Sequence, residues 1–186
     1  MSTREKIISQ IKNNKPPRIE LTEIPTFEGE VTVAAFKKNL EVVSGNAIEV
    51  TSLSEVEKTV NNLFPSAKQI ASNIMKGTIA IDETSERATL ELTEVAILKG
   101  DFGVAENGAI WLPESNMINR SLPFITQNLI LVIRKEEIVS NMHEAYGRCL
   151  PGSYGSFITG PSKTADIEQS LVIGAHGARS LTVILY

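Results

Sequence analysis

Residues 129–133, Leu-Ile-Leu-Val-Ile, form the longest aliphatic run of the chain and indicate its fold class. A continuous apolar strand without alternation is typical of a strand that is buried on both faces of a parallel sheet. The run is far too short to span a bilayer, which needs roughly 20 apolar residues. It therefore predicts the centre of a globular α/β domain.

Shorter apolar segments lie on both sides of this run, and segments of helical period separate them. Strands are expected at 47–50, 95–98, 109–112, 156–159 and 181–185, with less distinct ones at 69–74 and 76–81. Helices are expected at 31–43, from Ser52 or Ser54 to Leu63, at 136–148 and at 165–173. Strands that alternate with helices predict an α/β domain with a mostly parallel sheet.

The first 28 residues differ from this pattern. Residues 2–14 have the period of an amphipathic helix, with Ile7, Ile8 and Ile11 on one side, and a proline-containing acidic stretch follows. This helix could lie on the surface of the protein or dock onto a partner. We therefore expect an N-terminal helical arm and linker at 1–28 and a single domain at 29–186.

Composition excludes several classes of protein. A length of 186 residues with 42% hydrophobic and 22% charged residues is typical of one globular domain, and a net charge of −4 argues against nucleic-acid binding. The first fifteen residues contain no apolar core of a secretory signal, so we expect a cytoplasmic protein. Cys149, His143 and His176 are too few to hold an iron–sulfur cluster or a Cys- or His-based metal site.

The segment 157–168, FITGPSKTADIE, reads as a strand, a turn and the start of a helix. Ligands of α/β sheets bind where strands end, and the first amides of a helix lack intrahelical partners, so this loop is a candidate anion site. Its candidate ligand-binding residues are Gly160, Pro161, Ser162, Lys163, Thr164 and Asp166. The alternative is a tight turn and helix cap without a ligand.

Two sharper motifs do not fit this segment. Gly155 and Gly160 have the spacing of a phosphate-binding P-loop, but Pro161 stands where the lysine belongs. Ser162 could be a nucleophile with His176 as its base, but Thr164 stands where a nucleophile elbow has its closing glycine. We therefore expect neither motif to operate.

A second candidate loop, 105–110, carries Glu106, Asn107 and Gly108 at the end of an apolar run. Glu106 could be a general base or a covalent nucleophile there. Alternatively, it is an exposed glutamate beside a hairpin-like turn.

Three further side chains could contact a carboxylate ligand. His176 follows an expected helix and could either protonate a ligand or cap the helix. Arg120 and Arg179 could each bind a carboxylate in bidentate geometry or lie on the surface.

Together these segments resemble the lactate-utilisation (LUD) domain family, in particular its lactate utilisation protein C branch. The resemblance is carried by 159–168 (TGPSKTADIE), 171–177 (LVIGAHG) and 181–185 (LTVIL), with 103–108 and 120–123 in the expected order upstream. It implies a three-layer α/β/α domain of the sugar-phosphate isomerase and CoA-transferase-like superfamily. It also implies a role in oxidising lactate to pyruvate with iron–sulfur partner subunits, which would hold the clusters.

Within this resemblance, we expect a small anionic ligand between the loops at 160–166 and 106–108. His176 and Gly177 would lie near it, Arg120 would contribute a positive charge, and Glu106 and His176 are the candidate catalytic residues. No metal and no cofactor is expected on this chain alone.

The chain departs from the family pattern in two places. The family loop usually reads acidic residue-Thr-Gly-Thr, whereas this chain has Glu106-Asn107-Gly108-Ala109, and Ala178 replaces the usual proline after His176-Gly177. The altered loop is similar to the Glu-Asn-Gly signature that carries the catalytic glutamate of CoA transferases. A CoA-transferase-like enzyme with Glu106 as nucleophile is therefore one alternative, and a non-catalytic assembly subunit is another.

Overall fold

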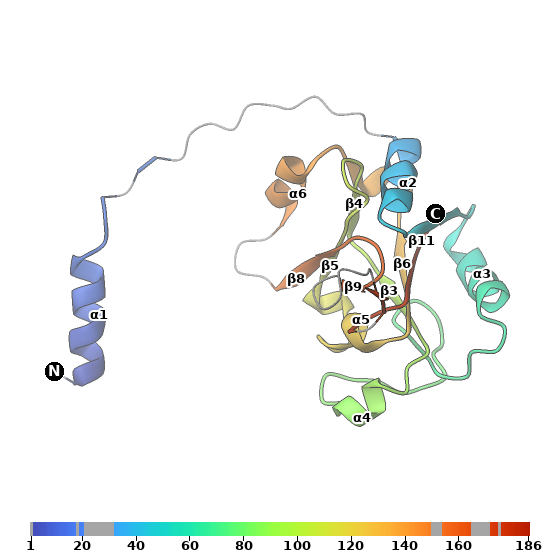
Figure 1. Ribbon diagram of the computed structural model, residues 1–186, viewed down its shortest axis with the longest axis horizontal. Helices are drawn as coiled ribbons and strands as arrows, with labels where there is room; N and C mark the ends of the chain where they lie inside the picture. Colours follow the sequence, from blue (N-terminus) through green and yellow to red (C-terminus); the bar gives the residue numbers. More distant parts are fainter. Residues whose placement is uncertain (1, 18, 21–31, 150–153, 165–171, 175) are drawn as a thin grey trace.

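A computed structural model describes residues 2–17, 19–20, 32–149, 154–164, 172–174 and 176–186 of the chain (Figure 1). The helices are α1 (Thr3–Asn13), α2 (Val33–Val42), α3 (Val56–Leu63), α4 (Arg87–Leu90), α5 (Leu122–Ile125) and α6 (Met142–Arg148). The strands are β1 (Asn46–Glu49), β2 (Ile70–Ser72), β3 (Val95–Lys99), β4 (Phe102–Val104), β5 (Ile110–Pro113), β6 (Asn128–Ile133), β7 (Ile138–Val139), β8 (Gly155–Ile158), β9 (Lys163–Thr164), β10 (Val172–Ile173) and β11 (Ser180–Leu185). Short 3-10 turns lie at η1 (Leu53–Glu55), η2 (Glu114–Asn116) and η3 (Lys135–Glu137).

A five-stranded parallel sheet with the order β1-β11-β6-β3-β2 forms the centre of the fold. The aliphatic run 129–133 makes up most of β6, and β6 pairs with β11 on one side and β3 on the other. Each residue of the run is at most 2% exposed. The prediction of a strand buried on both faces is therefore confirmed.

Helices cover both faces of this sheet. Side chains alternate along a strand, so Leu129, Leu131 and Ile133 pack on the side of α2, while Ile130 and Val132 pack on the side of α3. The expected α/β fold with a mostly parallel sheet between helices is confirmed.

A second sheet, with the order β7-β4-β5-β8, lies on the α2 side of the central sheet. One of its faces adds Ile110 and Leu112 to the main core, and the other packs Phe102, Val104 and Val139 against α6. Neither β4 nor β7 is predicted from the sequence, because each is too short to show a period of its own. On this side the central sheet is thus covered by a mixed sheet as well as by helices.

The helix expected at 136–148 is wrong in its first half. Ile138 and Val139 are β-branched and pair in parallel with Gly103 and Val104 of β4. The helix α6 begins only at Met142. Asn141 is its N-cap, and the Asn141 side chain accepts a hydrogen bond from the amide of Glu144.

The strand expected at 76–81 is not formed. The residues instead wrap the edge of β2, where the amide of Thr78 donates to the Ile70 carbonyl and the Thr78 hydroxyl accepts the Ile70 amide. The backbone groups of Ile70 at the sheet edge are therefore hydrogen-bonded to Thr78 and not to another strand.

The helix expected at 165–173 is wrong at its end. Val172 and Ile173 form β10, which pairs antiparallel with Thr164 and Lys163 of β9. Residues 165–171 lie outside the described part of the chain.

The expected N-terminal helix is present as α1. Ser2 and Glu5 form a capping box at its start, and none of its residues is buried. Figure 1 shows α1 standing apart from the two sheets. Within the described ranges, no helix has the length and apolar character needed to cross a membrane.

Candidate functional site

The loop that carries Glu106 is the turn of the β4–β5 hairpin. The amides of Val104 and Gly108 donate to the carbonyls of Ala109 and Val104, and the Asn107 side chain accepts the amide of Ala109. Gly108 adopts a φ of +68°, which a residue with a side chain rarely tolerates. Glu106 itself is exposed beside this hairpin turn.

The structure brings the two candidate loops together. Because Ile110 of β5 pairs with Ile158 of β8, the residues before β5 and after β8 meet at one end of the second sheet. There the Thr159 hydroxyl donates to the Asn107 carbonyl over 2.9 Å. We call the residues 105–109 and 159–162 the loop junction.

The loop junction rests on the carboxyl-terminal half of α2. A Cβ atom at Gly108 would lie 2.6 Å from the backbone N and Cα of Leu40. A Cβ atom at Gly160, whose φ is +77°, would overlap the Val43 carbonyl. Glycine at both positions therefore lets the two loops approach the same helix.

A cavity of about 410 Å³ adjoins Glu106. It is lined by Ala34, Ala35, Lys38, Asn39, Ala105, Glu106 and Ser140. One carboxylate oxygen of Glu106, Oε2, accepts the amide of Met142 over 2.9 Å, and the Asn39 side chain donates to the Ala105 carbonyl over 2.7 Å. The cavity thus presents a carboxylate fixed at one oxygen beside the cationic side chain of Lys38.

The sequence gives no signal for Lys38, Asn39 or Ser140. Asn39 and Ala105 are 66 positions apart, and Lys38 and Asn39 fall on an ordinary amphipathic helix. Only the packing of α2 against the hairpin places them beside Glu106.

The segment around His176 adjoins Ser162. The Ser162 amide donates to the Ala178 carbonyl over 2.8 Å, and the Gly174 amide donates to the Ser162 carbonyl over 2.9 Å. A Cβ atom at Gly177 would lie 3.0 Å from that of Ser162, and His176 is exposed. The segment that contains His176 and Gly177 therefore lies beside the loop junction.

The expectation of free amides in the turn after β8 needs a correction. The Ser162 amide is already bonded to Ala178, and Lys163 and Thr164 are strand residues rather than the approach to a helix. The expected helix therefore does not begin at 163–164, and Asp166 is outside the described residues. The side chains of Lys163, which is exposed, and Thr164, which is half-buried, remain candidates.

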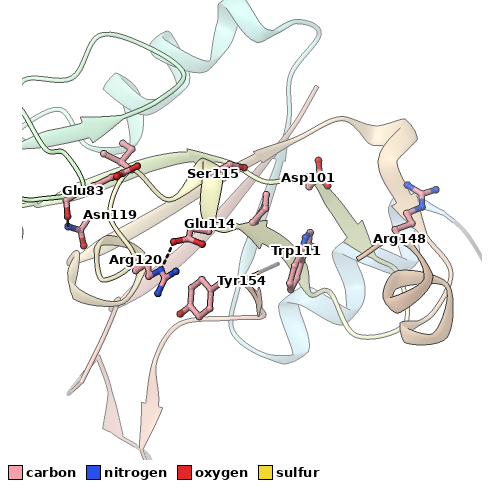
Figure 2. A pocket seen from close by; sticks show the side chains of 11 residues that line it. Glu83, Asp101, Trp111, Glu114, Ser115, Asn119, Arg120, Arg148 and Tyr154 are labelled. Carbon is pink, nitrogen blue, oxygen red and sulfur yellow. Dashed lines mark hydrogen bonds and ion pairs between the residues drawn. The ribbon is translucent and has the colours of Figure 1, made fainter. Parts of the chain in front are cut away.

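Arg120 lines a different cavity, of about 760 Å³, which none of the other predicted site residues lines (Figure 2). Its Nε donates to the Glu114 carboxylate over 2.5 Å, and its guanidinium lies 4.6 Å from the ring centre of Tyr154. The Arg120 hydrogen bond holds the pKa of Glu114 below its usual value. Arg179 is exposed, so neither arginine is shown to contact the loop junction.

Titratable side chains do not cluster as metal ligands. Across the described residues, no group of three or more His, Cys, Asp or Glu side chains could hold a metal ion. Cys149 is half-buried, and burial raises the pKa of its thiol.

The parallel sheet between helices and the loop junction at its side define an α/β protein with a candidate binding site built from loops. The LUD domain family matches residues 69–186, and the chain belongs to this family. The matched region contains both loops of the junction but not α2, which supports them.

The relatives agree with this family. The chain is 34% identical over 116 residues to Lactate utilization protein C of Geobacillus sp. (strain WCH70), covering 56% of this chain and 48% of that protein. It is 39% identical over 94 residues to Lactate utilization protein C of Shouchella clausii (strain KSM-K16), covering 47% and 41%. The matched segments thus span less than half the length of these curated relatives.

A solved structure supports the fold. The crystal structure of a DUF162 family protein from Deinococcus radiodurans superimposes with a TM-score of 0.64 at 19% sequence identity, covering 82% of this chain and 94% of that chain. At this level of identity the likeness establishes the fold alone.

Proposed function

We propose that this LUD-domain protein supports the oxidation of L-lactate to pyruvate together with iron–sulfur partner subunits, and that its loop junction binds a small anionic ligand. The role in lactate utilisation is supported by the family and by relatives named Lactate utilization protein C. The clusters belong to partners in this proposal, because the chain contains one cysteine.

The observation that carries the ligand site is the hydrogen bond from Thr159 to Asn107, which joins two loops that are 52 positions apart. Lys38 lines the adjoining cavity and Lys163 follows the junction, and both are exposed cations. A carboxylate or phosphate at the junction would gain a charge-assisted hydrogen bond from either lysine that it contacts. His176, next to Gly177 at Ser162, is a further donor in its protonated form.

Growth on L-lactate and lactate-dependent dye reduction in extracts test this proposal. A strain that lacks the gene is complemented with one of three chains. These are the wild type, a double variant that carries both Lys38→Gln and Lys163→Gln, and the control Lys58→Gln, which lies on the opposite side of the central sheet. We expect the control to restore oxidation fully and the double variant to restore at most about a tenth, since each lost charge-assisted bond costs roughly 1.5–3 kcal/mol. Normal growth on lactate without the gene contradicts the proposal.

Glu106 supports a second candidate function, a CoA-transferase-like enzyme. Its carboxylate is exposed and lines the cavity of about 410 Å³, and only Oε2 is bonded within the described residues. Oε1 would attack the thioester carbonyl of an acyl-CoA and expel the CoA thiolate, which would then attack the resulting anhydride at the glutamyl carbonyl. This step releases the acyl group as a carboxylate and leaves Glu106 as a thioester.

Incubation with acetyl-CoA followed by borohydride tests this chemistry, because borohydride reduces a glutamyl thioester to an alcohol. A mass change confined to the Glu106 peptide, and absent in Glu106→Gln, supports it. An unmodified peptide eliminates it.

An assembly subunit without catalysis is favoured by the exposed stripe of α1, where Ile7 and Ile11 are 52% and 59% exposed. In this case Ser162→Ala and Glu106→Gln leave lactate oxidation intact, whereas deletion of residues 1–28 prevents co-purification of the iron–sulfur subunits. Retention of those subunits by the truncated chain contradicts this alternative.

A further inference from the structure

A second cavity lies at the opposite end of β5 and β8 from the loop junction. The junction adjoins the pairing of Ile110 with Ile158, whereas this cavity adjoins the pairing of Pro113 with Gly155. It has a volume of about 760 Å³, within the usual range for small-molecule sites. We call it the β5 cavity; its lining includes Glu83, Asp101, Trp111, Arg120, Arg148 and Tyr154 (Figure 2).

Aromatic rings form one part of its wall. Trp111 is held in place by Phe157, whose ring centre lies 4.7 Å away, and by Gly155, where a Cβ atom would overlap the indole. Tyr154 is 44% exposed. The cavity therefore presents ring surfaces that are fixed by the sheet but still accessible.

The charges around the β5 cavity favour a cation. Arg120 is paired with Glu114, and Arg148 is paired with Glu137 and Glu144. The carboxylates of two further lining residues have no hydrogen bond or ion pair within the described part of the chain, and these are Glu83 and Asp101. Among the described residues that line the cavity, three carboxylates (Glu83, Asp101 and Glu114) accompany two guanidinium groups, which leaves one net negative charge.

The two arginines that line the cavity each combine an aromatic ring with a carboxylate, although only the partners of Arg120 line the cavity themselves. Arg120 lies over the Tyr154 ring while it donates to Glu114, and Arg148 lies 5.7 Å from the ring centre of Phe102 while it contacts Glu137. Cations bind aromatic faces through the ring quadrupole, and a neighbouring carboxylate adds a charged acceptor. Trp111 and Asp101 supply the same two kinds of group to the lining, an aromatic ring and a carboxylate that has no ion pair among the described residues.

We propose that the β5 cavity binds an organic cation of the guanidinium or alkylammonium class through the Trp111 ring and the unpaired carboxylate of Asp101, which both line it. The cation is either a free small molecule or the side chain of an arginine or lysine in a peptide. This site is separate from the loop junction and does not depend on lactate utilisation.

Trp111 is the single tryptophan of the chain, so its fluorescence reports on the cavity directly. The full chain is titrated with methylguanidinium, with butylammonium and with a blocked Ala-Arg-Ala peptide, at constant ionic strength. We expect a saturable change in fluorescence with at least one of these probes. Saturation by the free cations identifies a small-molecule site, and saturation by the peptide alone identifies a peptide site.

Variants separate this site from a non-specific salt effect. Asp101→Asn should weaken binding about tenfold because it keeps the size and removes the charge. Tyr154→Phe should leave binding within about twofold, because Arg120 already lies over the Tyr154 ring. The control Glu57→Gln, on α3 at the other side of the central sheet, should bind as the wild type does, and circular dichroism confirms that each variant is folded.

Three results overturn the proposal. They are the absence of saturation with every probe, equal affinity in folded Asp101→Asn, and tighter binding of pyruvate or phosphate than of the cations. The last result would mean that the arginines, not the carboxylates, determine what the cavity binds. None of these results affects the proposed role in lactate oxidation.

Discussion

Replacing Gly108 by alanine tests the way in which the loop junction is built. The substitution places a Cβ atom 2.6 Å from the Leu40 N and Cα atoms, which belong to the backbone of α2 and cannot rotate away. The φ of +68° adds strain of roughly 1–2 kcal/mol for a residue with a side chain. Displacement of the helix adds roughly 1–3 kcal/mol of overpacking.

We therefore expect Gly108→Ala to lower the free energy of unfolding by about 2–5 kcal/mol. Urea denaturation followed by circular dichroism measures this change, and roughly 2–4 °C of Tm per kcal/mol provides a second readout. The matched control is Gly147→Ala, because a Cβ atom at Gly147 meets nothing within 4 Å and the residue lies inside α6.

The control should raise stability by roughly 0.5–1 kcal/mol, since alanine loses less conformational entropy in a helix than glycine does. The same chemical change thus has opposite signs at the two positions. An unfolding free energy of Gly108→Ala within about 0.5 kcal/mol of the wild type would refute the packing of the hairpin turn on α2.

Three further outcomes are expected from the same measurements. Thr159→Val should lower stability by about 0.5–1.5 kcal/mol and Thr159→Ser much less, because only the valine variant loses the donor to Asn107; equal effects would contradict the bond. Leu131→Ala should cost roughly 2–5 kcal/mol, because this fully buried side chain lies on the central strand β6, and a loss below 1 kcal/mol would place it outside the core. Hydrogen bonds from the Gln69 and Lys68 amides lower the pKa of Glu94 in the folded protein. The contribution of Glu94 to folding stability is therefore complete above the usual pKa of 4.5 and is lost as the pH falls through the lowered pKa. Glu94→Gln should therefore remove part of the acid dependence of unfolding, and an unchanged dependence between pH 5 and about pH 2 would show that these bonds do not persist in solution.

The central sheet could be predicted from the sequence because a strand that is buried on both faces consists almost entirely of apolar residues. The run 129–133 and the closing strand at 181–185 lie at the positions expected, as β6 and most of β11. The strands β4 and β7 are too short to form such an apolar run and were not predicted. The pairing of β4 with β7 joins residues 35 positions apart, and it makes residues 138–139 a strand where a helix was expected.

The sequence alone also identified both candidate loops and the family, because glycine-rich turns and the block 159–168 are local patterns. It could not show that these loops are joined by Thr159, that they rest on α2, or that Lys38 and Asn39 stand beside Glu106. It also grouped Arg120 with the loops, whereas the structure places that side chain in the β5 cavity. These arrangements are decided only by tertiary packing, because they arise where separate strands end against one helix, and no residue pattern along the chain encodes which ends will meet.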